Sequence, residues 1–393
     1  MIITGKRIIT GDGKTIMEGG ALYLKNGLIE DIGPVNDLVA KHPEDEIADY
    51  GESSILPGLI DMHVHISASQ AHIDRDAATP YTIGYNALDF AQRALKSGVT
   101  TLRDVSSADS VCQSIIYSKL RGLVDNVPRI LHSNLAVCAT GGHGWFGMGC
   151  RQADGEDEIR KAVREQIRAG AHWIKIMSSH RTDGVSEYTQ EELNAATDEA
   201  RRHKKKTAVH ASIQPSLEFA INAGFDTIEH GTDLTLAQIK RMKEKGIAWV
   251  PTLLVHHTTL ERTQKVLDEK GKLNERQQET YDLYKHSVAV FKKNFKPYAE
   301  TGVMIVSGTD MIYDNGALVA GELALMSDYG MDNLSVIASG TSVCAKVLGM
   351  EGQIGILAKG AAADILIVEG NPAENIKALS DVRAVYFDGK LVN

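Results

Sequence analysis

Short apolar runs alternate with longer amphipathic segments through most of this chain. Between about residues 57 and 350 there are eight runs of strand length, each followed by a longer segment. The apolar runs are 59–64, 99–102, 130–136, 173–177, 208–210, 227–229, 248–250 and 303–306. Helical periodicity is clearest at 156–169, 190–204, 215–223, 236–245 and 276–301. This α/β pattern favours a (β/α)8 TIM barrel over a doubly wound sheet, since no GxGxxG motif follows the first run.

Both ends of the chain have a different pattern. Short β-like stretches separated by Gly, Asp and Asn turns occur near the N-terminus, as at 20–24, and near the C-terminus, as at 382–387. Two β-rich ends around a different middle predict one small β-sandwich domain built from both termini. We therefore expect a composite domain of residues 1–56 and 357–393, and a barrel domain of residues 57–356.

Charge and composition exclude several classes of partner. The chain has 42 basic and 51 acidic residues and no long Lys/Arg run, so a nucleic-acid partner is not expected. No apolar run reaches about 18 residues, so we expect no membrane span. The four cysteines form no CxxC pair, and the first residues do not resemble a signal peptide. These features predict a cytoplasmic globular protein.

Polar residues end several of the apolar runs, where a barrel enzyme builds its site. His63 and His65 are two residues apart in the first run, so both imidazoles face the same side of a strand. Two histidines alone are equally consistent with packed or exposed side chains. His210, His230 and Asp310 end or follow three later runs, and this recurrence favours a divalent metal site.

Lys175 is the unusual polar residue of the fourth run, because it stands between Ile174 and Ile176. A buried, unpaired ammonium group is costly. Snorkelling to solvent or pairing with an acid would relieve this cost. A neutral amine that reacts with carbon dioxide would instead form a carbamate, which bridges two metals as a carboxylate does. The residues alone leave both alternatives open.

The same residues occur in motifs that follow one another along nearly the whole chain. The motifs are 56–65, 98–104, 140–144, 174–177, 209–211, 227–231, 250–253, 308–310, 355–360 and 363–365. With these motifs the chain resembles the amidohydrolase superfamily, in particular its imidazolonepropionase-like and prolidase-like dipeptidase branch. The resemblance implies a TIM barrel with a β-sandwich formed by both termini.

The resemblance also implies a binuclear site with two Zn²⁺ ions per chain. The implied ligands are His63, His65 and Asp310 for one ion, His210 and His230 for the other, and carboxylated Lys175 as a bridge. The implied activity is hydrolysis of a C–N bond by a metal-bridging hydroxide. Asp310 would act as general base and then as general acid.

The implied substrate is a dipeptide or an N-acyl amino acid, a small-molecule partner, and we also expect a homo-oligomer. A cyclic amidase or a deaminase acting on a heterocyclic C–N bond is the alternative. Lys175 argues against a mononuclear deaminase, because such members of the superfamily generally lack this lysine. A non-enzymatic binding protein is a third possibility, which the intact set of ligands disfavours.

Four further residues are candidate substrate contacts. His143 lies in a Gly-rich loop and would donate to a substrate carbonyl or carboxylate, unless it only stabilises the loop. His180 and Arg181 replace a Gly-rich stretch common in the family, and Arg181 would clamp a carboxylate unless it is simply solvated. His256, in a Val-His-His stretch after the seventh run, is expected to face the pocket. The sequence at 313–316, where relatives commonly carry a histidine, is Tyr-Asp-Asn-Gly.

Three acids near the motifs are expected to have structural or supporting roles. Asp61 precedes the first histidine pair by two residues, and Asp104 follows the second run. Glu229 is next to His230, so strand alternation predicts that the two side chains face opposite sides.

Overall fold

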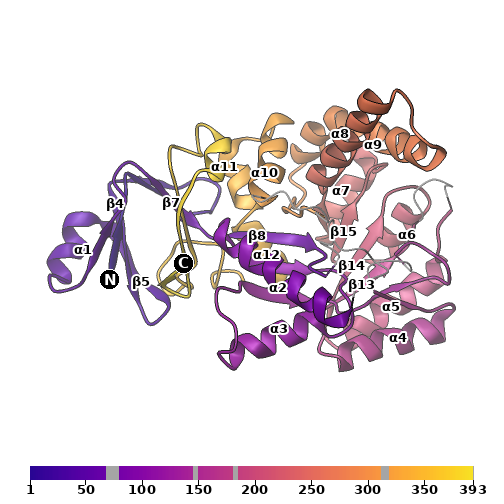
Figure 1. The fold of residues 1–393 in the computed structure, drawn as a ribbon, viewed down its shortest axis with the longest axis horizontal. Helices are drawn as coiled ribbons and strands as arrows, with labels where there is room; N and C mark the ends of the chain where they lie inside the picture. The colour runs from indigo at the N-terminus through magenta and orange to yellow at the C-terminus, as the bar shows by residue number, and fades with distance from the viewer. Residues whose placement is uncertain (68–78, 145–148, 180–184, 311–317, 393) are drawn as a thin grey trace.

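The computed structural model describes residues 1–67, 79–144, 149–179, 185–310 and 318–392. The chain has an α/β fold with parallel sheets in its larger part and a smaller β-rich part that contains both termini (Figure 1). Among the described residues, none of the helices combines the length and the apolar content that crossing a bilayer requires.

Parallel strands form the centre of the larger part. They make a three-stranded sheet of order β10-β9-β8 and a six-stranded sheet of order β12-β11-β13-β14-β15-β16. The strands are β8 (Leu59–Val64), β9 (Val99–Asp104), β10 (Arg129–His132), β11 (Ala136–Cys138), β12 (Cys150–Gln152), β13 (Trp173–Met177), β14 (Lys206–Ala211), β15 (Thr227–His230) and β16 (Ala248–Val250). The predicted runs at 173–177 and 248–250 are strands with the expected bounds.

Hydrogen bonds join these two sheets on both sides. On one side, the amide of Trp249 in β16 donates to Met304 at 2.8 Å, and the amide of Met62 in β8 donates to Ser307 at 2.9 Å. On the other side, the amide of His172 donates to His132 in β10 at 2.8 Å. The segment 303–306 thus lies between β16 and β8.

Two of the predicted strands differ from the structure. The segment 303–306 forms only an isolated parallel bridge, between Trp249 and Ile305. The run at 130–136 is divided between β10 and β11, because Asn134 between them has a left-handed backbone with φ of 60°. A left-handed residue cannot continue the pleat of a strand.

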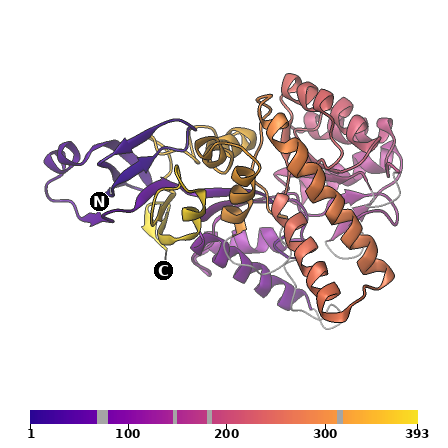
Figure 2. The same cartoon turned by 90° about the horizontal axis from the view of Figure 1, so that it is seen from above.

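Helices pack around the outside of the parallel strands (Figures 1 and 2). Five correspond to predicted segments: α4 (Glu156–Arg168), α5 (Gln190–Arg202), α6 (Ser216–Ala223), α7 (Leu236–Lys245) and α9 (Glu275–Ala299). The others are α2 (Pro80–Lys96), α3 (Val111–Leu120), α8 (Leu253–Lys270), α10 (Leu318–Asp328), α11 (Asn333–Ser339) and α12 (Ser342–Leu348). Gly224 and Gly246 end α6 and α7 with left-handed backbones, as expected for C-caps.

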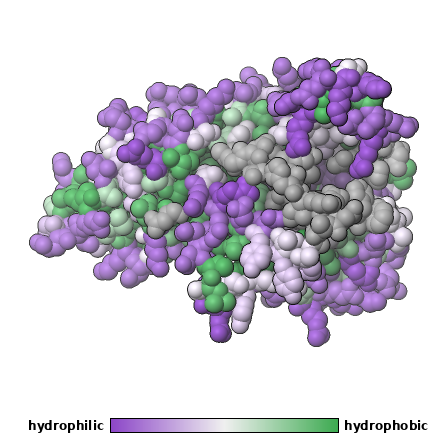
Figure 3. Space-filling model, viewed as in Figure 1, coloured by the Kyte–Doolittle hydropathy of each residue, from purple (hydrophilic) through white to green (hydrophobic). Residues whose placement is uncertain are grey.

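Two long helices, α8 and α9, form an antiparallel hairpin beside the carboxyl ends of the strands (Figure 2). The outer surface seen in Figure 3 is mainly hydrophilic. An apolar patch on this face lies over the end of α3, where Leu120 and Leu123 are 78% and 71% exposed.

The parallel strands bury both of their faces. In β13, Trp173 packs in an inner cluster with Met62 and Val250, whereas Ile174 packs in the outer cluster between strands and helices. Because strand side chains alternate, Lys175 faces the same inner side as Trp173. The fold therefore directs the Lys175 amine into the space enclosed by the strands.

The smaller part contains two sheets. A four-stranded sheet has the order β5-β4-β1-β6, and a six-stranded sheet has the order β19-β18-β17-β7-β2-β3. Their elements are β1 (Ile2–Thr4), β2 (Arg7–Ile9), β3 (Ile16–Glu18), β4 (Gly20–Lys25), β5 (Leu28–Pro34), α1 (Val35–Lys41), β6 (Ile47–Asp49), β7 (Ser54–Pro57), β17 (Ile365–Val368), η1 (Ile376–Ser380), β18 (Val382–Phe387) and β19 (Lys390–Leu391). The pairing of β7 with β17 joins the two ends of the chain, and Leu22, Ile55 and Ile365 share one apolar cluster.

Candidate active site

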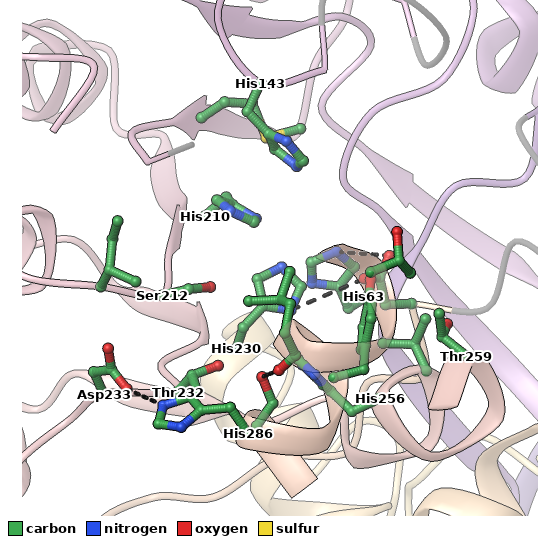
Figure 4. A pocket seen from close by; sticks show the side chains of 18 of the residues that line it. His63, His143, His210, Ser212, His230, Thr232, Asp233, His256, Thr259 and His286 are labelled. Carbon is green, nitrogen blue, oxygen red and sulfur yellow. Dashed lines mark hydrogen bonds and ion pairs between the residues drawn. The ribbon is translucent and has the colours of Figure 1, made fainter. Parts of the chain in front are cut away.

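A cavity of about 280 Å³ lies at the carboxyl ends of the parallel strands. All six predicted metal ligands line it: His63, His65, Lys175, His210, His230 and Asp310. Figure 4 shows the imidazoles of His63, His210 and His230 close together, with His143 beyond His210. The fold therefore brings together residues from five separate segments of the chain.

Asp310 lies beside the histidines of the first strand. Its Oδ1 is 3.5 Å from His63 Nε2 and 3.4 Å from His65 Nε2. Two ligands of one tetrahedral zinc ion, each about 2.1 Å from the metal, are separated by about 3.4 Å. One ligand atom each from His63, His230 and Asp310 also lie within 4.8 Å of one another. The distances from Asp310 to His63 and His65 fit a cation shared by these three residues, with His230 close by.

The second pair of histidines comes from the neighbouring strands β14 and β15. The ring centroids of His210 and His230 are 4.5 Å apart, and His143 stacks on His210 with centroids 4.2 Å apart. Burial lowers the pKa of both His210 and His230 well below the usual value. Their imidazoles are therefore neutral at physiological pH, as metal ligands must be.

Lys175 places a buried amine in the cavity. Its side chain is 1% exposed, and Nζ has no hydrogen-bond partner among the described residues. Burial lowers the pKa of Lys175 to about 8. Carbamate formation requires a neutral amine, which a buried lysine with a lowered pKa supplies near neutral pH. Together with four imidazoles and a carboxylate, Lys175 fits a site for divalent cations of the zinc type.

A buried ion pair orients His63. Glu229 Oε2 accepts a hydrogen bond from His63 Nδ1 at 2.6 Å, and Arg103 Nη2 donates to both oxygens of Glu229 at 2.8 and 3.0 Å. Burial opposes the charged form of Glu229, but Arg103 and His63 hold its pKa below the usual range. Because the carboxylate only accepts hydrogen bonds, His63 carries its proton on Nδ1, and Nε2 is left as the ligand atom.

The prediction that Glu229 and His230 face opposite sides is wrong. Both contact His63, Glu229 at Nδ1 and His230 ring to ring with centroids 5.1 Å apart. The reason is the backbone of His230, which has φ of 64° at the end of β15. Side chains alternate only while the backbone stays extended, and a single left-handed residue turns the His230 side chain back into the cavity.

His65 and His230 are oriented in the same way as His63. His65 Nδ1 donates to the carbonyl of Ser106 at 2.8 Å, and His230 Nδ1 lies 2.8 Å from Thr252 Oγ1. Burial disfavours the charged form of His65, but the adjacent Asp310 carboxylate outweighs burial and raises its pKa. In both histidines Nε2 is available to a ligand in the cavity.

Asp61 and Asp104 have the structural roles expected of them. Asp61 accepts hydrogen bonds from the His63 amide and from both the amide and the hydroxyl of Thr309, at 2.7 to 3.1 Å. It thereby ties the segment before Asp310 to β8. Asp104 accepts from the amide of Ile66 at 2.8 Å and holds the chain that follows His65.

Only some of the predicted substrate-binding residues are among the described residues. His143 and His256 line the cavity, and the rings of His256 and His230 are 6.1 Å apart. His257 does not line it and instead bonds Tyr329 Oη at 2.6 Å. His180 and Arg181 lie outside the described residues, as do 313–316, so their roles stay predictions.

Several residues on the α9 side of the cavity had no functional signal in the sequence. One face of α9 contributes Arg276, Thr280, Leu283, Tyr284 and Ser287. Their spacing of three or four residues was visible as helical periodicity, but nothing in the sequence places this helix over the cavity. His286, also on α9, lies 3.2 Å from Asp233 after β15, and Figure 4 shows this contact at the edge of the cavity.

Comparisons with known proteins agree with this geometry. The profile of the Amidohydrolase family matches residues 54–392. Ochratoxinase from Aspergillus niger is 27% identical over 98% of this chain and 84% of its own. A Xaa-Pro dipeptidase with methionine bound in its active site aligns over 99% of this chain and 98% of its own, with 27% identity and a TM-score of 0.87. A prolidase in complex with N-methylphosphonate-L-proline aligns over the whole of both chains, with 29% identity and a TM-score of 0.86.

These relatives imply a TIM-barrel fold and support hydrolysis of a C–N bond. The family match covers most of the chain, and the structural likeness extends over both the parallel strands and the terminal sheets. The chain belongs to the amidohydrolase family, in its prolidase-like branch, and is a hydrolase acting on carbon–nitrogen bonds.

Proposed function

We propose that the chain is a binuclear zinc-dependent amidohydrolase that cleaves the amide bond of a dipeptide or an N-acyl amino acid. The groups that would hold the ions are His63, His65 and Asp310 for one, His210 and His230 for the other, and carboxylated Lys175 between them. When bound, the two cations would lower the pKa of a water molecule and polarise the scissile carbonyl.

The observation that carries the proposal is the unpaired amine of Lys175. Its Nζ is buried at the cavity without a hydrogen-bond partner among the described residues, and its pKa is lowered to about 8. A structural lysine in this position would need a partner for its charge. A carboxylated lysine would avoid this cost. Its negative charge would be balanced by the cations that it binds between the two groups of imidazoles.

Asp310 would move the proton during hydrolysis. Burial favours its neutral form, but His63 and His65 hold its pKa below the usual range, so the carboxylate is ionised at neutral pH. As water attacks the carbonyl carbon, Asp310 would accept the proton that is released. It would then donate this proton to the leaving nitrogen as the C–N bond breaks.

His143 would position the substrate. It lies over His210 on the side of the cavity opposite α9, and its backbone amide donates to Glu187 Oε1 at 2.7 Å. This bond holds the loop, so that the imidazole can donate to a substrate carbonyl or carboxylate. His256, on the α8 side, would contact the remainder of the substrate.

The domain organisation is part of the proposal. Residues 57–356 would form a closed (β/α)8 barrel, supported by the hydrogen bonds that join the parallel sheets on both sides. Residues 1–56 and 357–393 would form one β-sandwich, supported by the apolar cluster shared by the two terminal sheets.

Turnover by zinc-loaded protein tests the proposed activity. The panel contains dipeptides and N-acyl amino acids beside cyclic amides and heterocyclic amines, and release of a free amino acid or of ammonia is measured. We expect hydrolysis of the linear amides, its loss in Lys175→Ala, and unchanged rates in Lys240→Ala, which removes an exposed lysine of α7. Turnover confined to heterocyclic amines or cyclic amides would replace the proposal with the deaminase or cyclic amidase alternative.

A further inference from the structure

One face of α9 forms a wall of the cavity from its buried end to its mouth. Ser287 and Tyr284 are 1% and 9% exposed, and the Tyr284 ring lies 5.2 Å from that of His256, beside the histidine cluster. Thr280 is half-buried, and Arg276, in the first turn of the helix, is exposed. Eight residues separate Arg276 from Tyr284, about 12 Å along the helix axis.

This gradient places Arg276 at the outer end of the cavity that contains the predicted metal ligands. Arg276 lines the cavity, so its guanidinium can contact a ligand at the outer end. Leu283 of α9 and Val255 of α8 also line the cavity and provide an apolar surface. The wall thus combines an apolar stretch with a terminal cation.

The guanidinium of Arg276 is available for a ligand. Within the described part of the chain it makes no hydrogen bond or ion pair, and only its backbone carbonyl is engaged, by Thr280 Oγ1 at 2.9 Å. Lys175 is the one lysine or arginine besides Arg276 among the described residues that line the cavity. Asp233, an acid that also lines the cavity, is engaged by His286 of α9 at 3.2 Å.

We infer that Arg276 binds a carboxylate of the substrate and so selects anionic amides whose carboxylate is separated from the scissile bond by an apolar portion. This inference rests on the proposed amide hydrolysis and adds its specificity-determining residue. A guanidinium binds a carboxylate through two parallel charge-assisted hydrogen bonds, a geometry that a neutral amide group cannot match. N-acyl ω-amino acids belong to this class, because an apolar chain separates their carboxylate from the scissile nitrogen.

Matched pairs of substrates test the inference. Each pair consists of an N-acyl ω-amino acid, whose carboxylate is separated from the scissile nitrogen by an apolar chain, and its terminal amide, which share the scissile bond. We expect wild-type zinc-loaded enzyme to prefer the acid, and Arg276→Met to lower kcat/KM for the acid about 10- to 100-fold while leaving the amide nearly unchanged. Arg276→Lys should recover part of the loss. Lys293→Met, which removes an exposed cation elsewhere on α9, should change neither.

Binding measured by calorimetry separates this inference from the proposed function. The free amino acid and its amide are titrated into wild type and Arg276→Met. A preference of the wild type for the acid that disappears in Arg276→Met supports the carboxylate site even if no substrate turns over, in which case only the proposed hydrolysis fails. Equal binding or equal kcat/KM of acid and amide in the wild type, or an equal loss of both in Arg276→Met, would overturn the inference.

Discussion

The side chains around the candidate metal centre are oriented by hydrogen bonds and an ion pair from residues that take no part in the proposed hydrolysis. His63 is fixed through Glu229, and Glu229 is in turn neutralised by Arg103, whose side chain is fully buried. Arg103 also stacks on Trp173, with its guanidinium carbon 4.6 Å from the ring centroid. The orientation of this candidate ligand thus depends on a charge pair that water does not reach.

Glu229→Gln tests this dependence. The amide can still accept from His63, but Arg103 is left with a buried, uncompensated charge. We expect a loss of about 3 kcal/mol in the free energy of unfolding, measured in urea, and zinc binding weakened about 10- to 100-fold. The control is Glu218→Gln, which breaks the partly exposed pair with Arg241 and should cost less than about 1 kcal/mol. Similar losses in both variants would show that the buried pair has no special role.

Asp310→Asn tests the proposed proton transfer. The amide keeps the shape of the carboxylate but cannot accept a proton, so we expect kcat to fall by about 10²- to 10⁴-fold while KM changes only a few-fold. Rates are measured with zinc in excess, and the metal content of the variant is determined in the same sample. A KM that rises as much as kcat falls would assign Asp310 to substrate binding instead.

Among the elements, helix α8 depends on a residue far away in the sequence. Its N-cap residue Thr252 has a left-handed backbone and makes no capping bond, because its hydroxyl is used by His230. Glu322 of α10 replaces the cap, accepting from the amides of Leu253 and Leu254 at 2.9 and 2.6 Å. One acid thereby secures the start of the helix that carries His256.

The pH dependence of stability tests the state of Glu322. Burial raises its pKa to about 8, although the two amide bonds oppose the rise. Between about pH 4.5 and 8 the folded state keeps a proton that the unfolded state has lost, so the free energy of unfolding falls as pH rises. Glu322→Gln cannot titrate and should flatten this slope. The free energy of unfolding is measured in urea at pH 5, 7 and 9 for wild type and Glu322→Gln, with a chelator present to remove the contribution of bound metal. Equal pH dependence in the two proteins would contradict the raised pKa of Glu322.

Local sequence patterns predicted those helices and strands whose formation depends on their own residues. The amphipathic segments of α4, α5 and α7 and the runs of β13 and β16 were predicted within a few residues. Helix α8 was not, because its start is secured by Glu322 rather than by a local cap. The division of the third run also depends on the backbone of one residue, Asn134, which no apolar pattern indicates.

At the scale of the whole molecule, parallel strands bring distant residues to one edge. This rule made most of the candidate ligands predictable, because His210, His230 and Asp310 end or follow apolar runs and the carboxyl ends of parallel strands meet. It did not predict the α8–α9 hairpin over the cavity or Arg276 at its mouth, because those positions depend on how helices pack back over the sheet. The prediction that the Glu229 and His230 side chains face opposite sides was wrong for a related reason. It depends on the left-handed backbone of a single residue, His230, at the end of a strand.

The zinc content of the purified, zinc-loaded chain tests the binuclear site most directly. Mass spectrometry of the metal, referenced to protein concentration, should give two ions per chain for wild type in bicarbonate-containing buffer. Lys175→Ala should hold one ion or none, since the bridging ligand is removed, and Lys240→Ala should hold two. One ion per chain in the wild type, or two tightly held ions in Lys175→Ala, would contradict a binuclear centre bridged by this lysine.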